Sequence, residues 1–478
     1  MTTTTSLPIE QLVAGVVSEP SESLDLWHTD PDTGERLGQA RASSPDSVDA
    51  ALAAAAQAHL DGRWQGLGTD ERAQHLLRFS EELGKLAEDL AVADSLDSGV
   101  PLSVTRQLCA MSSGLPGGLG QLAPGVLASD AEGASGPVAQ RWLPWGPAAV
   151  FSPWNAPTTT AVGKVSFALA AGAPVILKPS EWAQRSASLI GQAARAAGLP
   201  DGVLQVVHGG AGVGQQLAAD PRIAAVSYTG GSAGGRAVAA ASAAHLRPLD
   251  LELSGSNAVV LLPDADLDAA ATEIATAMLF LNGQWCAGPT RVIAPRGSVD
   301  ALTQALLERL DAVTIGPSTD PGSQLGPMAH QGHVAALEQQ LRRFAEQGAT
   351  VHRPGRPPEG SGHFFAPAVV TGAPADEIDE EIFGPAVTVQ GYDDVDDAVR
   401  RANRGELGLS AYVFSAGWET ASAVGVRLRA GIVGVNKIQP MLAPPVPEAV
   451  ASMWAGSGLG TIGMAASLRF FTGARLVY

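Results

Sequence analysis

A cysteine, an asparagine and a glutamate lie in local contexts that suit covalent chemistry at a carbonyl carbon. Cys286 ends the segment NGQWC, Asn155 ends FSPWN, and Glu252 is the second residue of LELSG. A thiolate can attack a carbonyl, an amide N–H can hold the developing oxyanion, and a carboxylate can activate water for thioester cleavage. A hydride must leave between these steps, so we expect a nicotinamide cofactor beside the cysteine. The three residues together predict the oxidation of an aldehyde.

Each of these residues also has a purely structural interpretation. Cys286 could be a small buried hydrophobic residue, and this is how we interpret the other cysteine, Cys109. Glu252 could cap a helix at the end of its strand. Asn155 could cap the helix that follows Pro157, a role compatible with oxyanion binding.

The composition is typical of a globular protein with two or three domains. The chain has 478 residues, 45% hydrophobic and 16% charged. Its net charge of −18 argues against nucleic acid or an anionic membrane as a partner. The start, MTTTTSLP, lacks the features of a secretory signal, and no uninterrupted apolar stretch reaches the ~20 residues that span a bilayer. Two cysteines do not support a disulfide framework, so we expect a cytoplasmic protein.

Short apolar segments alternate with segments of helical composition between residues 148 and 253. We expect strands at Ala148–Phe151, Val175–Leu177, Leu204–Val207, Ala224–Tyr228 and Leu249–Leu253. This alternation predicts βαβ units and a mostly parallel, doubly wound sheet. Ligands bind at the carboxyl ends of the strands in such sheets. Four candidate site residues fall there: Asn155, Lys178, Gly230 and Glu252.

A second alternating region, at about 254–435, predicts another α/β domain with Cys286 near its start. Its expected strands are Ala258–Leu262, Arg291–Ala294, Phe365–Thr371, Ala386–Gln390, Ala411–Phe414 and Ile432–Asn436. Near the N-terminus we expect a hairpin turn at 30–34, a helix to His59 capped by Ser44, and a helix over 72–93. The segment 114–136, rich in Gly, Pro and Ser, is expected to separate these helices from the strands that follow.

Six motifs make nearly the whole chain, from about residue 10 to 478, resemble the aldehyde dehydrogenase superfamily. They are SPWN (152–155), KPSE (178–181), YTG (228–230), LELSG (251–255), GQWC (283–286) and EIFGP (381–385). The resemblance implies a Rossmann-like cofactor domain, an α/β catalytic domain and a small β extension that mediates homodimers or homotetramers. The expected bounds are 1–123 and 143–253 for the cofactor domain, 254–464 for the catalytic domain, and 124–142 with 465–478 for the extension.

The same resemblance assigns a set of cofactor-binding residues. These are Ser152, Pro153, Trp154, Lys178, Ser180, Glu181, Gly212, Thr229, Gly230, Ser232, Leu253, Glu381 and Phe383. Glu181 would accept hydrogen bonds from a ribose 2′-hydroxyl and repel a 2′-phosphate, which favours NAD over NADP, although NADP stays possible because Lys178 could pair with a phosphate. The helix after Thr229 would hold the pyrophosphate at its N-terminus. Glu381 would bind the nicotinamide ribose, with Phe383 near the ring.

Small side chains after Asn155 suggest a wide substrate channel. Ala156, Thr159, Thr160 and Gly163 stand where the family commonly presents bulkier groups, and Trp285 beside the nucleophile could stack on the substrate. We therefore expect a bulky or aromatic aldehyde. The chain also departs from the family at Ile462, where an acidic residue is common, so a proton-exit role assigned to that position does not carry over.

Two other functions stay open. A CoA-acylating enzyme would let CoA intercept the thioester, but such enzymes often lack the hydrolytic base that Glu252 supplies. An inactive family member could serve as a binding or structural protein. His330 and His333 have a spacing that metal sites use, but no third ligand is evident, and we expect no metal.

Overall fold

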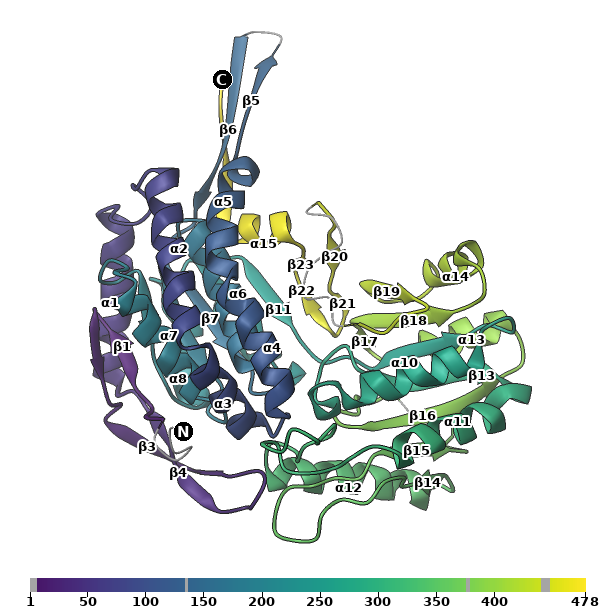
Figure 1. Ribbon diagram of the computed structural model, residues 1–478. Coiled ribbons are helices and arrows are strands. Elements are labelled where there is room, and N and C mark those ends of the chain that lie inside the picture. Colours follow the sequence, from purple (N-terminus) through teal and green to yellow (C-terminus); the bar gives the residue numbers. More distant parts are fainter. Residues whose placement is uncertain (1–6, 134–135, 375–378, 440–447) are drawn as a thin grey trace.

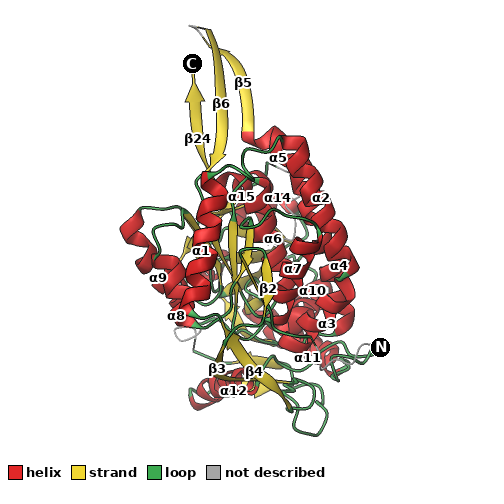
Figure 2. Ribbon diagram, turned by 90° about the vertical axis from the view of Figure 1, so that its left-hand side faces the viewer, coloured by secondary structure: helices red, strands yellow, loops and turns green. Residues whose placement is uncertain are grey.

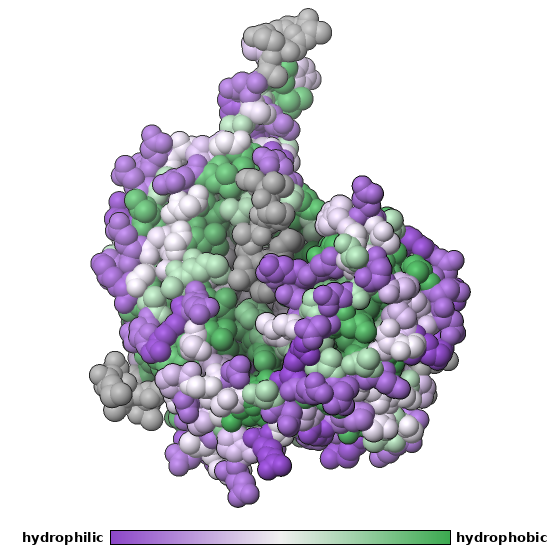
Figure 3. Space-filling model, turned by 45° about the vertical axis from the view of Figure 1, so that its right-hand side comes forward, coloured by the Kyte–Doolittle hydropathy of each residue, from purple (hydrophilic) through white to green (hydrophobic). Residues whose placement is uncertain are grey.

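The computed structural model describes residues 7–133, 136–374, 379–439 and 448–478. Within these residues the chain forms two large parallel-stranded sheets, each packed against helices, and a narrow three-stranded arm that projects from the first of them (Figure 1). In the space-filling view, hydrophilic residues cover much of both lobes, and hydrophobic residues gather beside the hollow between them (Figure 3).

The first sheet confirms the predicted doubly wound arrangement. Its strands, in spatial order, are β2 (Val16–Ser18), β1 (Gln11–Val13), β9 (Leu204–Val206), β8 (Val175–Pro179), β7 (Ala148–Ser152), β10 (Ala225–Thr229), β11 (Leu249–Glu252) and β22 (Gly458–Leu459). The five strands from β9 to β11 are parallel, and the strand order reverses direction between β7 and β10. Ligands bind at such a switch point, so the ends of β7 and β10 mark the expected cofactor crevice.

Alternating residues of the central strand β7 pack on opposite faces of this sheet. Ala148 and Val150 face a core shared with helices α6 (Pro157–Ala170) and α7 (Arg185–Ala196), while Ala149 and Phe151 face another core. That second core is formed with α1 (Pro45–Leu60), α8 (Ala211–Ala219) and α9 (Ser232–Ser242). Figure 2 shows the strands enclosed between these groups of helices. Burial on both faces explains why β7 and β8 are apolar up to their carboxyl ends, where Ser152 and Lys178 stand.

The second sheet contains the six strands expected after residue 254. In spatial order its strands are β14 (Thr350–His352), β15 (Ala368–Thr371), β16 (Ala386–Tyr392), β13 (Pro289–Pro295), β12 (Asn257–Leu261), β18 (Ser410–Phe414) and β19 (Ile432–Val435). Only β14, at the edge, is antiparallel among them. The helices of this part are α10 (Leu267–Leu279), α11 (Val299–Asp311), α12 (Gln331–Glu346), α13 (Val395–Ala402) and α14 (Trp418–Gly425).

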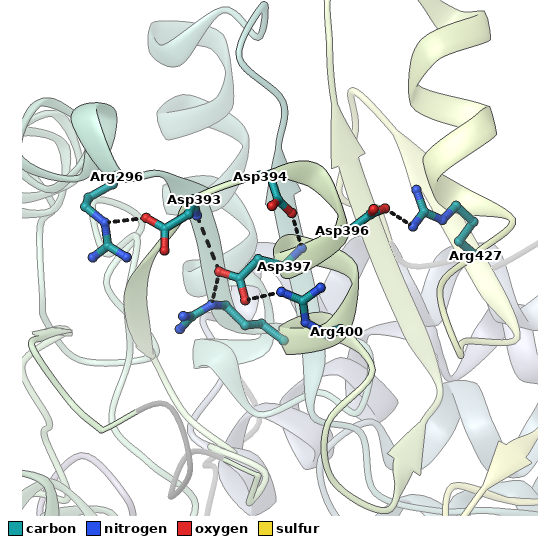
Figure 4. A network of polar contacts seen from close by, with 8 residues as sticks. Arg296, Asp393, Asp394, Asp396, Asp397, Arg400 and Arg427 are labelled. Atoms are coloured by element: carbon teal, nitrogen blue, oxygen red, sulfur yellow. Dashed lines mark hydrogen bonds and ion pairs between the residues drawn. The ribbon is translucent and has the colours of Figure 1, made fainter.

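Charged side chains hold the start of α13, on the surface of the second sheet (Figure 4). Asp394 caps the helix by accepting the backbone N–H of Asp397 at 2.7 Å. The carboxylate of Asp397 in turn accepts from Arg401 at 2.8 Å, and Arg296 donates to Asp393 at 2.8 Å. Exposed pairs of this kind stabilise a protein by only about 0–1 kcal/mol each, so the network fixes a helix end and contributes little to the core.

The helical region before the first sheet differs from the prediction in two places. The helix expected over 72–93 is two helices, α2 (Thr69–Lys85) and α3 (Ala87–Ser98), separated at Leu86. The segment 114–136 was expected to be a separating stretch, but α4 (Leu102–Ser113) is followed at once by α5 (Leu115–Leu127). The glycines of α5 allow close packing against α2, because a Cβ on Gly120 would lie 3.1 Å from the Cα of Ala73.

The projecting arm is built from β5 (Ala128–Gly133), β6 (Gly136–Pro144) and β24 (Thr472–Val477), all antiparallel. It is joined to the body through α5 and α15 (Met464–Phe470). At the opposite side, β3 (Glu22–Thr29) and β4 (Arg36–Ala42) form the hairpin predicted from residues 30–34. Gly34 adopts a φ of 76° at its turn. No helix among the described residues has the length and apolar character needed to cross a bilayer.

Candidate active site

A cavity of about 520 Å³ lies where the carboxyl ends of the first sheet meet the second sheet. Cys286, Glu252 and Asn155 all line it, so the structure brings together the three residues selected from the sequence. They come from separate elements: Asn155 follows β7, Glu252 ends β11, and Cys286 lies in the loop between α10 and β13.

The loop that carries Cys286 has an unusual backbone. Leu281, Asn282 and Gly283 have φ values of 50°, 58° and 72°, in the left-handed region that costs energy for residues other than glycine. The buried side chain of Asn282 compensates with three hydrogen bonds. It donates to the carbonyls of Gly99 and Pro327, each at 2.9 Å, and it accepts the N–H of Gly326 at 3.0 Å.

Two further amide side chains fix the loop on either side of the nucleophile. Gln284 donates to the carbonyl of Ser98 at 3.0 Å and accepts the N–H of Ala329 at 3.0 Å. Asn257 donates to the carbonyl of Cys286 at 2.8 Å. The hydrogen bonds of Gln284 and Asn257 could not be predicted from the sequence, because the bonded residues lie far apart in the chain.

Asn155 reaches the same loop from the first sheet. Its side-chain amide donates to the carbonyl of Gln284 at 2.7 Å. The N-cap of α6 is Ala156, which makes no side-chain cap, so Asn155 does not have the helix-capping role that was its alternative interpretation. Its amide is therefore held beside the backbone that leads to Cys286.

The environment of Glu252 suits a general base. Burial raises its pKa above the usual range, and the hydroxyl of Thr229 donates to it at 3.2 Å. A raised pKa suits a group that must take up a proton near neutral pH. The backbone carbonyl of Glu252 accepts the N–H of Gly230 at 3.1 Å, and this bond fixes the strand end that carries the carboxylate.

A partly buried ion pair beside Glu252 was not expected from the sequence. Lys164 of α6 donates to Asp250 at 2.9 Å and to Ser227 at 2.7 Å. Asp250 and Glu252 are two residues apart on β11 and therefore point to the same face of the sheet. The charge of Lys164 lowers the pKa of Glu252, while the charge of Asp250 raises it. The spacing of Asp250 and Glu252, two residues apart on a predicted strand, was the feature of the sequence that could have predicted that both carboxylates lie on one face.

The environment of Cys286 keeps its sulfur protonated in the resting site. Burial raises the pKa of the thiol, and the charges of Glu252 and Glu381 raise it further, while backbone N–H groups act in the opposite direction. Attack on a carbonyl requires the thiolate. The sulfur therefore needs a base within the site to accept its proton, and Glu252, one of three glutamates that line the cavity, can serve as that base.

Eleven of the thirteen predicted cofactor residues line the cavity. They are Ser152, Pro153, Trp154, Lys178, Ser180, Glu181, Thr229, Gly230, Leu253, Glu381 and Phe383. The other two, Gly212 and Ser232, lie outside this lining, in the first turns of α8 and α9.

The polar groups on this side of the cavity fit a dinucleotide. The hydroxyls of Ser152 and Ser232 are buried without a hydrogen-bond partner. Helix α9 begins after Gly231, which makes no side-chain cap, and a Cβ on Gly231 would meet nothing within 4 Å. An uncapped helix N-terminus beside open space is suited to a pyrophosphate. Glu181 lies 3.9 Å from the ammonium group of Lys178 at the far end.

The histidines whose spacing suggested a metal site belong instead to an aromatic cluster. Trp182 stacks on His330 with ring centroids 3.9 Å apart, and Trp154 lies edge-on to His333 and Phe383 at 5.3 and 5.5 Å. Burial lowers the pKa of His330 to about 4, so its ring is neutral. Among the described residues, no group of three or more acidic, His or Cys side chains could hold a metal ion.

The other side of the cavity contains three of the five predicted substrate residues in open positions. Ala156, Thr159 and Thr160 line it, whereas Gly163 does not, because a Cβ there would face Leu115 at 3.9 Å. Trp285 borders the cavity but is only 6% exposed, and its ring nitrogen donates to the carbonyl of Ala277 at 3.0 Å. The lining also includes residues that were not predicted from the sequence, among them Leu108, Phe280, Leu281, Leu409 and Ile432, and it includes Ile462, whose apolar character departs from the family.

Comparison with known proteins agrees with this site. The aldehyde dehydrogenase family model matches residues 18–477. A geranial dehydrogenase from Castellaniella defragrans is 33% identical over 92% of this chain and 92% of its own length. A betaine aldehyde dehydrogenase from Rhizobium etli is 31% identical over 98% of this chain and 96% of its own length.

Solved structures show the same fold. An NAD-dependent aldehyde dehydrogenase from Sinorhizobium meliloti superimposes with a TM-score of 0.91 at 30% identity, covering 98% of this chain and 94% of that one. Aldehyde dehydrogenase C from Pseudomonas syringae, solved as a mutant with NAD+ and octanal, gives 0.89 at 30% identity and covers 98% and 96%. The chain belongs to the aldehyde dehydrogenase family and is an NAD(P)-dependent aldehyde dehydrogenase.

Proposed function

We propose that this enzyme oxidises a bulky, uncharged aldehyde with an apolar branched or aromatic skeleton to the carboxylic acid. The observation that carries this proposal is the distribution of groups in the cavity. Its charged lining residues, within the described chain, are Lys178, Glu181, Glu252 and Glu381, all among the catalytic and cofactor positions. The remaining wall contains small or apolar side chains, such as Ala156, Leu108 and Ile462. Such a wall favours apolar substrates and leaves room for branching.

Acylation would use the three residues in sequence. Glu252 accepts the proton of Cys286, the sulfur bonds to the aldehyde carbon, and the carbonyl oxygen becomes an oxyanion. The side-chain amide of Asn155 and the backbone N–H of Cys286 stabilise that oxyanion. A bound nicotinamide cofactor, held by the cofactor residues named above, would supply the acceptor for the hydride that leaves this carbon, and a thioester would remain on Cys286.

Deacylation would use Glu252 again, after the proton taken from Cys286 has passed to solvent. Its carboxylate accepts a proton from water as the water attacks the thioester, and the acid departs while the thiolate is released. A CoA-acylating enzyme would need no such base. The buried carboxylate of Glu252, with its raised pKa, therefore favours the hydrolytic reaction over the alternative.

We propose NAD as the preferred cofactor. Glu181 lies at the cavity edge, where a 2′-hydroxyl could donate to its carboxylate and a 2′-phosphate would be repelled. Lys178 is buried, and its ammonium group already donates to the carbonyl of Pro179 at 3.0 Å, so fewer of its N–H donors remain for the 2′-phosphate of NADP.

Steady-state and burst kinetics with short aliphatic, long aliphatic and aromatic aldehydes test this function. Cys286→Ala should abolish turnover. Cys109→Ser, at the buried cysteine outside the cavity, retains a donor toward Asp94 and should retain turnover. Glu252→Gln should slow both the NADH burst and the release of the acid, because the carboxylate serves both steps. A full burst followed by slow release, with a thioester visible by mass spectrometry, would restrict Glu252 to deacylation. Acceleration by added CoA would support the acylating alternative, and a preference for acetaldehyde would contradict the bulky substrate.

We also infer that the arm joins copies of the chain. Strand β24 is an edge of its sheet and exposes Leu476 and Val477 at 57% and 56%. An exposed apolar edge strand favours pairing with another chain. Leu476→Lys should lower the mass measured by light scattering if the enzyme is a dimer or tetramer. An unchanged mass would count against this role for the arm.

The division into domains at the residues given above stays a proposal. Strand β22 lies in the first sheet although residues 458–459 fall within the expected catalytic range. A cytoplasmic location is likewise proposed, because Cys109 and Cys286 are both free thiols, which suits a reducing compartment.

A further inference from the structure

A buried carboxylate outside the cavity lies against the start of the helix that follows Asn155. Asp94, in the last turns of α3, is 3% exposed. One of its oxygens accepts the hydroxyl of Thr158 at 2.7 Å, and the other accepts the backbone N–H of Thr158 at 3.2 Å. Thr158 is the second residue of α6 and lies three residues after Asn155.

Helix α6 depends on this contact because its own sequence supplies no cap. Ala156 is the N-cap residue and has no polar side chain, and Pro157 has no N–H. Asp94 supplies from a different helix the acceptor that an N-cap Ser or Asp would normally supply. The first turn of α6, and with it the short link back to Asn155, is thereby fixed to α3.

The end of α3 also holds the loop of the nucleophile. The carbonyl of Ser98 accepts from the side chain of Gln284, and the carbonyl of Gly99 accepts from Asn282. Residues 94–99 therefore fix both the strand end that carries Asn155 and the loop whose backbone carries Cys286. The two donors proposed for the oxyanion share one short segment as their support.

We propose that Asp94 is a positioning residue for the reaction, which fixes the side-chain amide of Asn155 relative to the backbone N–H of Cys286. This rests on the proposed role of Asn155 in binding the oxyanion. Asp94 acts through Asn155 and is not among the residues that line the cavity. An oxyanion site depends on the preorganisation of its donors, so a small displacement of one donor lowers the rate with little effect on substrate binding.

The replacement Asp94→Asn tests this at nearly constant volume. The amide retains one oxygen acceptor but presents an NH₂ donor in place of the other oxygen, so Thr158 can no longer donate both its hydroxyl and its backbone N–H to residue 94. We expect kcat to fall about tenfold and KM to change little. The rate should fall equally for acyl transfer from p-nitrophenyl acetate, which needs the thiol and the oxyanion donors but no cofactor.

The decisive comparison is a double-mutant cycle with Asn155→Ala. If Asp94 acts through Asn155, Asp94→Asn should lower the rate in the native background and should have no further effect once Asn155 is alanine. An equal loss in both backgrounds would overturn the proposal. If Asn155→Ala leaves the rate of acyl transfer unchanged, Asn155 does not bind the oxyanion and Asp94 has no donor to position. If Asn155→Ala lowers the rate but Asp94→Asn does not, only the positioning role of Asp94 is overturned.

Thr105→Val is the matched control for a loss of stability. The hydroxyl of Thr105 on α4 donates to the carbonyl of Ala91 on α3 at 2.9 Å, a buried bond between helices that does not lead to Asn155. If the two variants lose Tm equally, only Asp94→Asn should lose rate, and equal rate losses would contradict the proposal. Should Asp94→Asn fail to fold, Thr158→Val, which removes the hydroxyl and retains the N–H, carries the same cycle.

Discussion

The side-chain amide of Asn155 donates a 2.7 Å hydrogen bond to the backbone carbonyl of Gln284, two residues before Cys286. An amide group has two N–H donors, so this bond occupies one and leaves the other for a substrate oxygen. The contact aligns the donor in the absence of substrate. It also joins the first sheet to the loop that carries the nucleophile.

Gly255→Ala should disable the nucleophile without altering any catalytic side chain. A Cβ at this position would lie 2.2 Å from the carbonyl oxygen of Cys286, which Asn257 holds in place. The resulting displacement should lower kcat on the order of 100-fold, as measured by steady-state turnover. Gly125→Ala in α5 is the control, because a Cβ there meets nothing within 4 Å and turnover should be unchanged.

The pair Lys164–Asp250 should set the pH at which Glu252 works. Glu252 must be ionised to accept a proton, so deacylation should increase as pH rises through its pKa. Lys164→Met removes a charge that lowers this pKa, and should move the rising limb to higher pH. Asp250→Asn removes a charge that raises it and should move the limb to lower pH. Shifts of the same sign in the two variants would contradict this electrostatic account.

Ala156→Phe should narrow the cavity on the substrate side. We expect kcat/KM to fall about tenfold or more for branched or aromatic aldehydes and to change little for propanal. Gly163→Ala, on the same helix but outside the lining, should leave the ratio between these substrates unchanged. Equal losses of kcat/KM for all aldehydes with Ala156→Phe would contradict the proposal that the space beside Ala156 accommodates bulky substrates.

Glu181→Gln should improve the use of NADP relative to NAD. The variant removes the negative charge that would face a 2′-phosphate, and we expect the ratio of kcat/KM values to shift about tenfold. Cofactor titration by quenching of tryptophan fluorescence should show the same shift in Kd. Glu419→Gln, at an exposed site on α14, controls for the change in net charge.

The sequence predicted the first sheet well because its strands are buried on both faces. Residues such as Val150 and Ile176 have no exposed surface, and this produces continuous apolar segments that stand out from the helices. The helix α5 was missed because Gly117 and Gly120 are also typical of turns. Their actual role, close contact with α2, depends on a neighbour that a local pattern does not identify.

The sequence predicted the side chains that carry out the chemistry, because each is marked by a short local motif. Cys286, Glu252 and Asn155 stand in short motifs at strand ends, and the structure places all three on one cavity. Residues that act through distant partners were missed, because Asn282 bonds to Gly99 across 183 positions of the chain. The position of Gly163 outside the cavity lining could not be predicted from the sequence, because only the packed structure shows which side of α6 faces the cavity.

The three successive left-handed residues before Cys286 also bear on how the enzyme matures. The left-handed conformation of Leu281 and Asn282 costs energy, which contacts from the end of α3 and from residues 326–327 offset. A newly made chain would not retain that winding of the backbone by itself. We expect that partial unfolding which breaks these contacts releases the winding and leaves the sulfur without a fixed position.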